Sequence, residues 1–453
     1  SPVVLQNKKT LRKIVGIHSF ALESGVRTYA MNITQDDLLR GLSQFKEVFV
    51  QDIDGLPHMQ LATGSYQFEH PLGISKLGFA GLCSRPPNAP VKSDLRPSII
   101  HGEIFEPTTA PSVLYDREVD VLQKGVAKAA ISTPYLPQKE VDSAVEEVKN
   151  QLYKGSHRSS NFRRVLTPME AVQGLSEECE YLGPIDRRTS PGYPWVLIRK
   201  GVGKQCFLGC DDRYFIREDL QERIQQRYEL ATEGIRAPTV WVDTLKDERR
   251  TLDKIQAKKT RVFSCGPQDF TILFRMFFLG FIAHIMLNRI GNEQSIGTNP
   301  FGPDWGMTAR KLSLKGPAVI AGDFSSFDGT LNAQIMWAFV GVANEWYNDG
   351  DENATVRRTL MLDVINSVHL CRNVYYDCDH SQPSGNPATT IINSFYNSVS
   401  MRMVFARCVP KGIRFSDTVS MVSYGDDNVV NIDESILPFF NQQTITSGYA
   451  TIG

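Results

Sequence analysis

Apolar residues spaced three or four apart predict a mainly helical segment between about residues 116 and 153. Within it, one side of a helix carries Val141, then Val145 or Val148, and then Leu152. Such a stripe is what a helix presents when it packs against a core. We therefore expect a helix with one buried side here.

The most apolar run of the chain, residues 271–290, predicts a second helix. Arg275 interrupts this run, so its charge-free part is shorter than the roughly 20 residues that a membrane span needs. We expect a buried helix and no transmembrane segment.

Short β-prone runs predict strands elsewhere. Residues 1–35 read as short strands with turns, and residues 318–321 read as a buried strand followed by a helix from about Gly329. Two further runs, residues 418–424 and 428–432, lie on either side of a short acidic segment. No internal repeat accompanies these elements.

The composition is that of a globular protein with a large core. The 453 residues are 42% hydrophobic and 22% charged, which fits about two to four domains. The net charge of −1 means that any nucleic-acid-binding surface must be local. Among eight scattered cysteines only Cys206 and Cys210 lie close together, so we expect free thiols and no zinc site.

Two acids follow the strand predicted at residues 318–321. Asp323 ends that strand, and Asp328 stands at the turn before the next helix. An acid at a strand end is common, and Asp328 would also serve as an ordinary helix N-cap. Taken alone, the pair does not indicate a function.

A loop rich in small residues leads into a helix with a polar face. Ser384, Gly385 and Pro387 predict the loop. Three polar residues then recur at every fourth position and share one face of the helix: Thr389, Asn393 and Asn397. This face offers hydroxyl and amide groups to a polar ligand such as a ribose. The alternative is an amphipathic helix whose polar face is solvated.

Gly425, Asp426 and Asp427 predict a tight hairpin turn with Asp426 at its tip. If the neighbouring strand is the one that ends in Asp323, the carboxylates converge, and they repel each other unless a cation neutralises them. Carboxylate oxygens suit Mg²⁺ or Mn²⁺. Two such ions about 3.5–4 Å apart activate an attacking hydroxyl and stabilise a leaving phosphate. The alternative is a solvated acidic turn.

Positive charge is concentrated in one segment. Its basic residues are Lys246, Arg249, Arg250, Lys254, Lys258, Lys259 and Arg261. They could clamp a triphosphate or an RNA backbone through charge-assisted hydrogen bonds. The alternative is a solvated loop in which Asp247, Glu248 and Asp253 pair with them.

These four pieces, in this order, resemble the RNA-dependent RNA polymerase of picorna-like, and in particular dicistrovirus-like, positive-strand RNA viruses. Each piece is weak alone, but the combination at this spacing is specific. The resemblance implies three catalytic carboxylates that bind Mg²⁺ or Mn²⁺: Asp323, Asp426 and Asp427. It also implies that Asp328 and Asn393 recognise the ribose 2′-hydroxyl, with support from Thr389.

The resemblance assigns the loops and the basic segment as well. Ser384 and Gly385 would form the flexible loop that contacts template and nucleotide. The basic residues of the nucleotide site, with the last as the candidate for the triphosphate, would be Lys246, Arg250, Lys259 and Arg261. The stretch TSPGYP is similar to the template-entrance motif, which implies RNA contacts for Thr189, Ser190 and Gly192.

The N-terminal stretch KIVGIHSFALESGVRTYAMNIT carries a second resemblance. It is similar to the last strands of the chymotrypsin-like cysteine protease of the same viruses. In that family Gly-x-His places the histidine in the pocket for the substrate glutamine, which here implies His18. The nucleophilic cysteine is absent from this chain, so we expect an inactive remnant within a polyprotein fragment.

The implied fold is α+β, a right-hand polymerase with fingers and palm but no thumb, preceded by a β-barrel protease remnant. The expected parts are residues 1–40 (protease remnant), 41–70 (linker and processing junction), 71–280 (fingers), 281–330 (palm), 331–377 (fingers insertion) and 378–453 (palm). Because the thumb and its general acid would lie beyond Gly453, we expect the fragment itself to have little activity.

The implied function is template-directed RNA synthesis for viral genome replication, in which a primer 3′-hydroxyl attacks the α-phosphate of a ribonucleoside triphosphate. The implied partners are RNA template and primer, a small protein primer and other viral replication proteins, at membrane-associated replication complexes in the host cytoplasm. One rival is a reverse transcriptase, which typically carries a bulky residue where Asp328 stands. The other is a non-catalytic RNA-binding palm protein, against which the full set of acids argues.

Overall fold

The computed structural model places the chain in two units, Ser1–Met59 and Gln60–Gly453. The residues it describes are 2–4, 14–21, 28–32, 59–60 and 78–453. In the first unit, β1 (Pro2–Val4), β2 (Ile14–Ala21) and β3 (Thr28–Asn32) form an antiparallel sheet in the order β1-β2-β3. Strands predicted in this region are thus confirmed. His18 belongs to β2, but its side chain, like most of the predicted junction at 41–70, lies outside the described residues.

Among the described residues, the second unit contains three sheets. The largest has the order β4-β5-β12-β11-β7-β9; its β11–β7 pair is parallel, and the β11–β12, β12–β5 and β7–β9 pairs are antiparallel. Its strands are β4 (Met59–Gln60), β5 (Gly78–Cys83), β12 (Val374–Asp377), β11 (Val368–Cys371), β7 (Val240–Leu245) and β9 (Val262–Cys265). The other sheets are β6 (Thr109–Pro111) with β8 (Arg249–Thr251), and the antiparallel trio β10 (Ala318–Gly322), β14 (Asp427–Ile432) and β13 (Val419–Tyr424).

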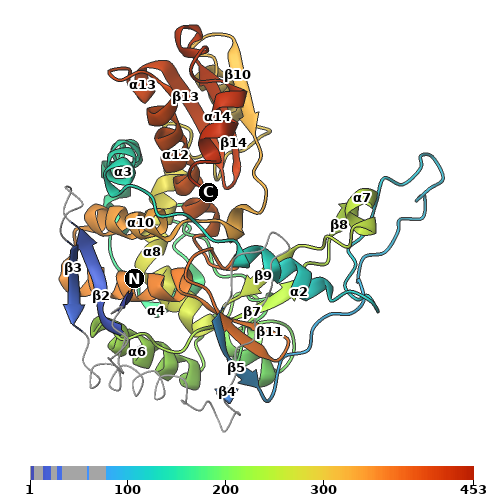
Figure 1. The fold of residues 1–453 in the computed structure, drawn as a ribbon. Coiled ribbons are helices and arrows are strands. Elements are labelled where there is room, and N and C mark those ends of the chain that lie inside the picture. The colour runs from blue at the N-terminus through green and yellow to red at the C-terminus, as the bar shows by residue number, and fades with distance from the viewer. Residues whose placement is uncertain (1, 5–13, 22–27, 33–58, 61–77) are drawn as a thin grey trace. The chain divides into compact units, whose positions relative to one another are not determined.

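Helices surround these sheets. The longer helices are α3 (Gln138–Leu152), α6 (Glu218–Thr232), α8 (Gln268–Leu287), α9 (Pro303–Lys311), α10 (Ala333–Tyr347), α11 (Asp351–Ile365), α12 (Thr389–Cys408) and α14 (Gln442–Tyr449). The short ones are α2 (Val121–Val126), α4 (Pro168–Gln173), α5 (Gln205–Leu208), α7 (Leu252–Gln256), α13 (Phe415–Thr418) and five 3-10 turns: η1 (Ala127–Ala130), η2 (Ser156–Phe162), η3 (Trp195–Leu197), η4 (Phe327–Gly329) and η5 (Glu434–Ile436). Figure 1 shows β10, β13 and β14 with α12, α13 and α14 at one end of this unit.

Helix α8 is the core helix that the apolar run predicted. It is long and apolar enough to cross a membrane, yet 78% of its apolar window is buried inside the protein. Phe274 stacks on Phe278 with 4.3 Å between ring centroids. The Arg275 guanidinium donates hydrogen bonds to two backbone carbonyls, those of Ala171 at 2.7 Å and Gly183 at 2.6 Å. An arginine is therefore tolerated in a buried helix because its donors are satisfied.

Helix α3 confirms the predicted stripe and decides between its alternatives. Val141, Val148 and Leu152 are buried, whereas Val145 is half-buried. The helix packs against α10 and α12. The buried face thus follows the i, i+3, i+4 positions of a helix that covers a core.

Strand β10 differs from the prediction of a buried strand. It is the edge of its sheet, so one side has no neighbouring strand. Its burial alternates along the strand, and Val319 is 51% exposed. An apolar run of this length does not reveal whether a strand is central or at an edge.

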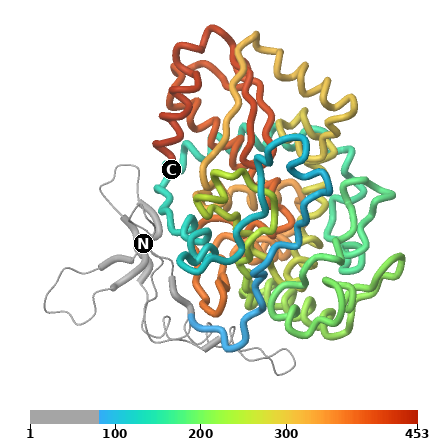
Figure 2. The backbone as a smooth tube through the Cα atoms, turned by 90° about the vertical axis from the view of Figure 1, so that its right-hand side faces the viewer, coloured from blue at the N-terminus to red at the C-terminus, as the bar shows by residue number. Residues whose placement is uncertain are grey.

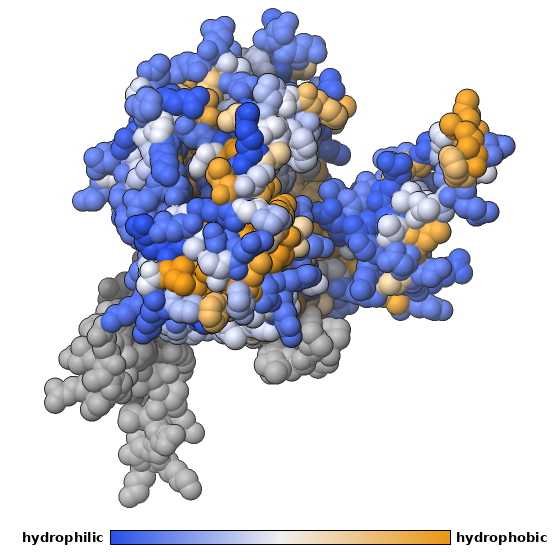
Figure 3. All heavy atoms as spheres, turned by 90° about the horizontal axis from the view of Figure 1, so that it is seen from above, coloured by the Kyte–Doolittle hydropathy of each residue, from blue (hydrophilic) through white to orange (hydrophobic). Residues whose placement is uncertain are grey.

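The start of the second unit runs beside the basic segment. Ser93 Oγ and the Asp94 backbone N–H donate to the Asp247 carboxylate, both at 2.7 Å, and β6 pairs with β8. Figure 1 shows this blue chain segment projecting with α7 and β8, and Figure 2, viewed from that side, shows the blue segment in front of the rest of the unit. Figure 3 shows apolar surface at the tip of the projection, where the exposed apolar residues are Ile99, Ile100, Ile104 and Phe105.

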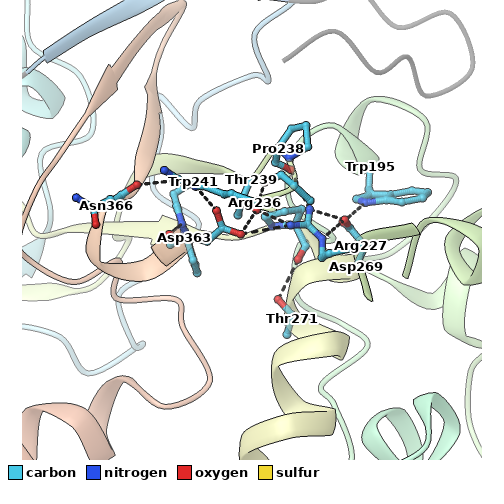
Figure 4. A network of polar contacts seen from close by, with 12 residues as sticks. Trp195, Arg227, Arg236, Pro238, Thr239, Trp241, Asp269, Thr271, Asp363 and Asn366 are labelled. Atoms are coloured by element: carbon cyan, nitrogen blue, oxygen red, sulfur yellow. Dashed lines mark hydrogen bonds and ion pairs between the residues drawn. The ribbon is translucent and has the colours of Figure 1, made fainter. Parts of the chain in front are cut away.

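A buried polar network joins the helices beneath the largest sheet (Figure 4). Arg227 of α6 donates to the carboxylate of Asp269 at 2.7 Å and lies 3.5 Å from that of Asp363 in α11. Trp195 donates its indole N–H to Asp269 at 2.7 Å. Arg227, Asp269 and Asp363 are all buried, so this network holds three segments together in the interior.

Candidate active site

The acidic segment forms the predicted hairpin. Strands β13 and β14 pair from Val419↔Ile432 to Tyr424↔Asp427, which leaves Gly425 and Asp426 as the two-residue turn. Gly425 has φ +65°, a conformation that glycine adopts without steric cost. Asp426 therefore stands at the tip.

Strand β10 brings Asp323 to this turn. It pairs antiparallel with β14, and Gly322 lies opposite Asn428. Asp323 follows Gly322, so it leaves the sheet beside the start of β14. Sequence positions a hundred residues apart thus meet at one end of a three-stranded sheet.

The carboxylates interact electrostatically. Burial raises the pKa of the Asp426 carboxyl above its ordinary value, and the nearby carboxylates of Asp427, Asp328 and Asp323 raise it further. Asp323, Asp328 and Asp427 therefore lie near enough to Asp426 to interact with it electrostatically. Asp426 is half-buried, whereas Asp323 and Asp427 are exposed, so the turn is partly solvated.

This acid group has the donor chemistry of a Mg²⁺ or Mn²⁺ site. Within residues 78–453 and the other described positions, no three His, Cys, Asp or Glu side chains already stand close enough together to hold a metal ion. The donors are nevertheless all carboxylate oxygens, which hard cations prefer. Like charges destabilise the ionised form of Asp426, and a cation would remove that penalty. The residues present therefore fit a divalent cation.

Side chains of helix α12 hold the β13–β14 turn through hydrogen bonds. The Asn397 side-chain amide donates toward the carbonyls of Gly425, Asp426 and Asp427 at 3.2, 3.0 and 3.4 Å. Ser394 Oγ accepts from the Gly425 N–H at 2.7 Å. Asn393 and Asn397 of the polar face are buried and Thr389 is half-buried, so the alternative of a solvated face is wrong for the two asparagines. Sequence reasoning missed Ser394, although it stands one turn before Asn397.

We expect Asn397→Ala to lower the free energy of unfolding by about 2 kcal/mol, because three turn carbonyls lose their buried donor. Urea denaturation measures the change. Asn150→Ala is the control, since Asn150 is exposed on α3 and bonds only within its own helix turn, to Glu146. A loss no larger in Asn397→Ala than in the control would contradict the proposed support.

Asp328 and Asn393 meet, as the shared role predicted for them requires. Asn393 Nδ2 donates to Asp328 Oδ1 at 2.9 Å. The other amide atom, Asn393 Oδ1, is buried and has no hydrogen-bond partner among the described residues. Asp328 is not a helix N-cap: it lies in η4, and α10 begins four residues beyond the expected Gly329, with Asn332 as its cap.

The Ser384–Gly385 loop and the predicted template-entrance loop at residues 189–192 both pack on the end of β9. The Ser264 N–H donates to Ser384 Oγ at 3.3 Å, and a Cβ on Gly385 would lie 2.2 Å from the Ser264 carbonyl oxygen. A Cβ on Gly192 would lie 2.1 Å from the carbonyl oxygen of Gly266. Only glycine fits either position.

Polar contacts within each loop fix its shape. Thr389 Oγ1 donates to the Asn386 carbonyl at 2.8 Å and lies 3.2 Å from that of Ser384. Ser190 Oγ accepts from the backbone of its own loop at 3.2 Å, and Thr189 Oγ1 donates to Asp186 at 2.8 Å. Thr189 and Ser190 are exposed and so remain accessible to a ligand.

The basic segment has features of both predicted alternatives, an anion-binding segment and a solvated loop that pairs with its own acids. Glu248 lies 3.3 Å from Lys246 and 3.6 Å from both Arg250 and Arg261. One carboxylate serves three cations, so positive charge remains in excess. Arg261 has a side chain that is 59% exposed, and Lys259 is also exposed. The segment is therefore partly paired and still able to bind an anion.

Comparison with known proteins agrees with this geometry. The family model described as viral RNA-dependent RNA polymerase matches residues 100–448. The chain is 43% identical over 484 residues to the replicase polyprotein of acute bee paralysis virus, covering 100% of this chain and 25% of that polyprotein. It is 36% identical over 486 residues to the replicase polyprotein of cricket paralysis virus, covering 98% and 27%.

The chain therefore spans about a quarter of the length of these curated relatives. A solved structure, the Sicinivirus 3Dpol RNA dependent RNA polymerase, superposes with a TM-score of 0.67 at 23% identity, over 82% of this chain and 74% of that one. That likeness shows a shared fold of mixed helices and strands. The extent of the family match and the identity to two replicases decide the assignment. This chain belongs to the viral RNA-dependent RNA polymerase family.

Proposed function

We propose that this chain carries the nucleotidyl-transfer site of a viral replicase that extends an RNA primer on an RNA template. One observation carries the proposal: Asp427, Asp328 and Asp323 lie near enough to Asp426 to raise the pKa of its carboxyl, in addition to the larger effect of burial. Such a convergence is costly without a cation, so it indicates a site built for one.

Asp323 and Asp426 would hold the divalent cations, with Asp427 assisting. Bound Mg²⁺ or Mn²⁺ lowers the pKa of an attacking hydroxyl and offsets charge on a leaving pyrophosphate. The protein's own contribution is to position the reacting groups and to neutralise their charge. Asn397 and Ser394 keep the hairpin that carries Asp426 in place.

The remaining residues would bind the nucleotide and the template. Arg261, with Lys246, Arg250 and Lys259, would neutralise the triphosphate, since Glu248 leaves these cations with excess charge. Ser384 and Gly385 would contact the template and nucleotide. The RNA template would enter along Thr189, Ser190 and Gly192, whose loop packs on Gly266.

Asp328 and Asn393 would select ribonucleotides. Asn393 Oδ1, which has no hydrogen-bond partner among the described residues, would accept a hydrogen bond from a 2′-hydroxyl. The Asn393 side chain is held by its hydrogen bond to Asp328. A ligand without that hydroxyl leaves the buried acceptor unpaired. This feature favours an RNA polymerase over a reverse transcriptase.

We expect Asn393→Ala to reduce the preference for ATP over 2′-deoxyATP by about tenfold, because the acceptor for the 2′-hydroxyl is lost. Calorimetric titration of both nucleotides in the presence of Mg²⁺ measures the ratio. Asn344→Ala, which alters a half-buried amide on α10, is the control. An unchanged ratio in Asn393→Ala would remove this residue from ribose selection.

The wider assignments follow from the same proposal. The second unit would supply fingers (71–280 and 331–377) and palm (281–330 and 378–453), and β11 and β12 of the insertion share a sheet with β7 and β9. Residues 1–40 would be an inactive protease remnant, and residues 41–70 would be the linker with the processing junction. The polyprotein would act with a small protein primer and other viral proteins at cytoplasmic membranes of an infected cell.

Single-nucleotide extension of an RNA primer–template tests the function. It is run on the chain itself and on a longer segment of its replicase polyprotein, with each nucleotide supplied separately. We expect incorporation of the complementary ribonucleotide only. Preference for deoxyribonucleotides would indicate a reverse transcriptase, and RNA binding without extension by either protein would indicate a non-catalytic palm.

A further inference from the structure

Strand β9 carries the contact between the largest sheet and the Ser384–Gly385 loop. It is an edge strand, so the backbone of Ser264 has a free side on which the loop packs. The Ser264 N–H donates to Ser384 Oγ at 3.3 Å, and Gly385 leaves no room for a Cβ above the Ser264 carbonyl. The position of Ser264 therefore sets the position of this loop.

A buried carboxylate anchors Ser264 from the other side. Ser264 Oγ donates to Asp243 Oδ1 at 2.7 Å, across the β9–β7 pair in which the two residues face each other. Asp243 also lies 2.9 Å from His369 Nδ1 and accepts from the Tyr376 hydroxyl at 2.5 Å. All four residues are buried. Hydrogen bonds to a carboxylate are about twice as strong as neutral ones, so the Ser264 hydroxyl is firmly held.

The loop is tied in turn to the predicted ribose-binding acid. The Gln382 N–H donates to the Asp328 carbonyl at 3.0 Å, two residues before Ser384. Asp243, Ser264, Asp328, Gln382 and Ser384 also line one small cavity of about 30 Å³. A continuous path of hydrogen bonds and backbone thus leads from Asp243 through Ser264 and the loop to Asp328.

We propose that Ser264 is a positioning residue for ribonucleotide selection. It does not touch the nucleotide; its hydroxyl holds β9 on Asp243, β9 holds Ser384, and the loop holds the backbone of Asp328. Loss of the hydroxyl lets the loop and Asp328 shift relative to Asn393. The inference rests on the proposed function, since it concerns how that site recognises a ribose.

Titration of ATP and of 2′-deoxyATP, each with Mg²⁺, tests the proposal on the 453-residue chain. In Ser264→Ala we expect the affinity ratio to fall by about five- to tenfold, the effect of losing one positioning hydrogen bond. Ser264→Thr keeps the hydroxyl, and its added methyl group lies at a position that lines the cavity. This variant should therefore keep the affinity ratio of the parent. Thermal unfolding shows that each variant is folded.

Ser159→Ala is the matched control, because Ser159 is equally buried and bonds His284 at 2.7 Å far along the chain from the loop. It should lower stability and leave the ratio unchanged. In an Asn393→Ala background, Ser264→Ala should have no further effect on the affinity ratio, because both residues act on recognition of the same ribose hydroxyl.

These measurements distinguish a wrong role for Ser264 from a wrong assignment of the ribose site. If the parent prefers ATP and Ser264→Ala keeps that preference, the role of Ser264 is wrong and the proposed function stands. If Ser264→Thr lowers the ratio as much as Ser264→Ala, the hydroxyl is not the positioning group and the proposal is also wrong. If the parent binds both nucleotides equally, the ribose site itself fails, and this inference fails with it.

Discussion

Asp426→Asn is expected to lower nucleotide incorporation by the longer replicase segment by about 100- to 1,000-fold, while making the 453-residue chain more stable in the absence of a divalent cation. The loss of activity follows from removing a carboxylate that we propose holds the divalent cations. The gain in stability follows from the raised pKa of Asp426, which burial causes first and the neighbouring acids increase. Both effects come from the same carboxylate.

The sign of the stability change depends on pH. A carboxyl whose folded-state pKa is raised favours the protonated form on folding, so its penalty is absent at low pH and appears as the pH rises through the folded-state pKa. At neutral pH the parent carries the full penalty and the Asn variant carries none. The two proteins should therefore converge in melting temperature as the pH falls towards the ordinary aspartate range.

Thermal unfolding with and without Mg²⁺ measures this directly. Mg²⁺ should raise the melting temperature of the parent and have little effect on Asp426→Asn. Asp433→Asn is the matched control, since Asp433 follows the far end of β14 and an asparagine retains its capping role. Incorporation at the parent rate, or an undiminished response to Mg²⁺, would show that Asp426 is not a cation ligand.

Arg227→Leu is expected to lower the free energy of unfolding by about 3 to 5 kcal/mol. The Arg227 guanidinium donates to Asp269 Oδ2 from Nε at 3.0 Å and from Nη2 at 2.7 Å. Its removal leaves Asp269, which is 2% exposed, as a buried charge with too few partners. Trp195, which follows the template-entrance loop, bonds the same carboxylate, so that loop should loosen as well.

Acid pH should abolish much of the difference in the free energy of unfolding between the parent and Arg227→Leu. Burial raises the pKa of Asp269, but the charges of Arg227 and Arg223 outweigh this and hold the pKa below its ordinary value. A lowered pKa contributes stability above the unfolded-state value and loses it as the pH falls through the folded-state value. The parent should therefore lose this contribution in acid, whereas Arg227→Leu has already lost it.

Urea denaturation across pH checks the network. Arg358→Leu, an exposed position on α11, is the charge-matched control and should change stability by less than about 0.5 kcal/mol. Adding Asp269→Asn to Arg227→Leu should recover part of the loss, because the buried charge is then removed while a partner for Trp195 remains. No recovery in the double variant would contradict the account of an unpaired Asp269.

Local structure could be read from residue order because short-range sterics and periodicity decide it. The Gly425–Asp426 turn needs a positive φ at one position, and the runs on either side of it are β-prone and pair as strands. The stripe on α3 and the apolar run of α8 were likewise visible as spacing. The identity of the acids and the order of the motifs were sufficient to predict the family.

Long-range packing decided what periodicity left open. The polar face of α12 looked like a solvated side, yet Asn397 is buried because the β13–β14 turn sits on it. The exposure of β10 depends on its place at a sheet edge, which no local pattern encodes. Ser264 carried no signal at all, because its neighbours Asp243 and Ser384 are distant in sequence.

Residue order encodes which chemical groups are present and which short elements carry them: a strand that ends in Asp323, a turn that presents Asp426, and a helix with amides on one face. The meeting of these groups depends on the tertiary structure. Pairing of β10 with β14 places Asp323 beside Asp427, over a hundred residues later. Backbone sterics act between neighbours, whereas a site is made by sheet register and core packing between residues far apart, and those contacts exist only in the folded chain.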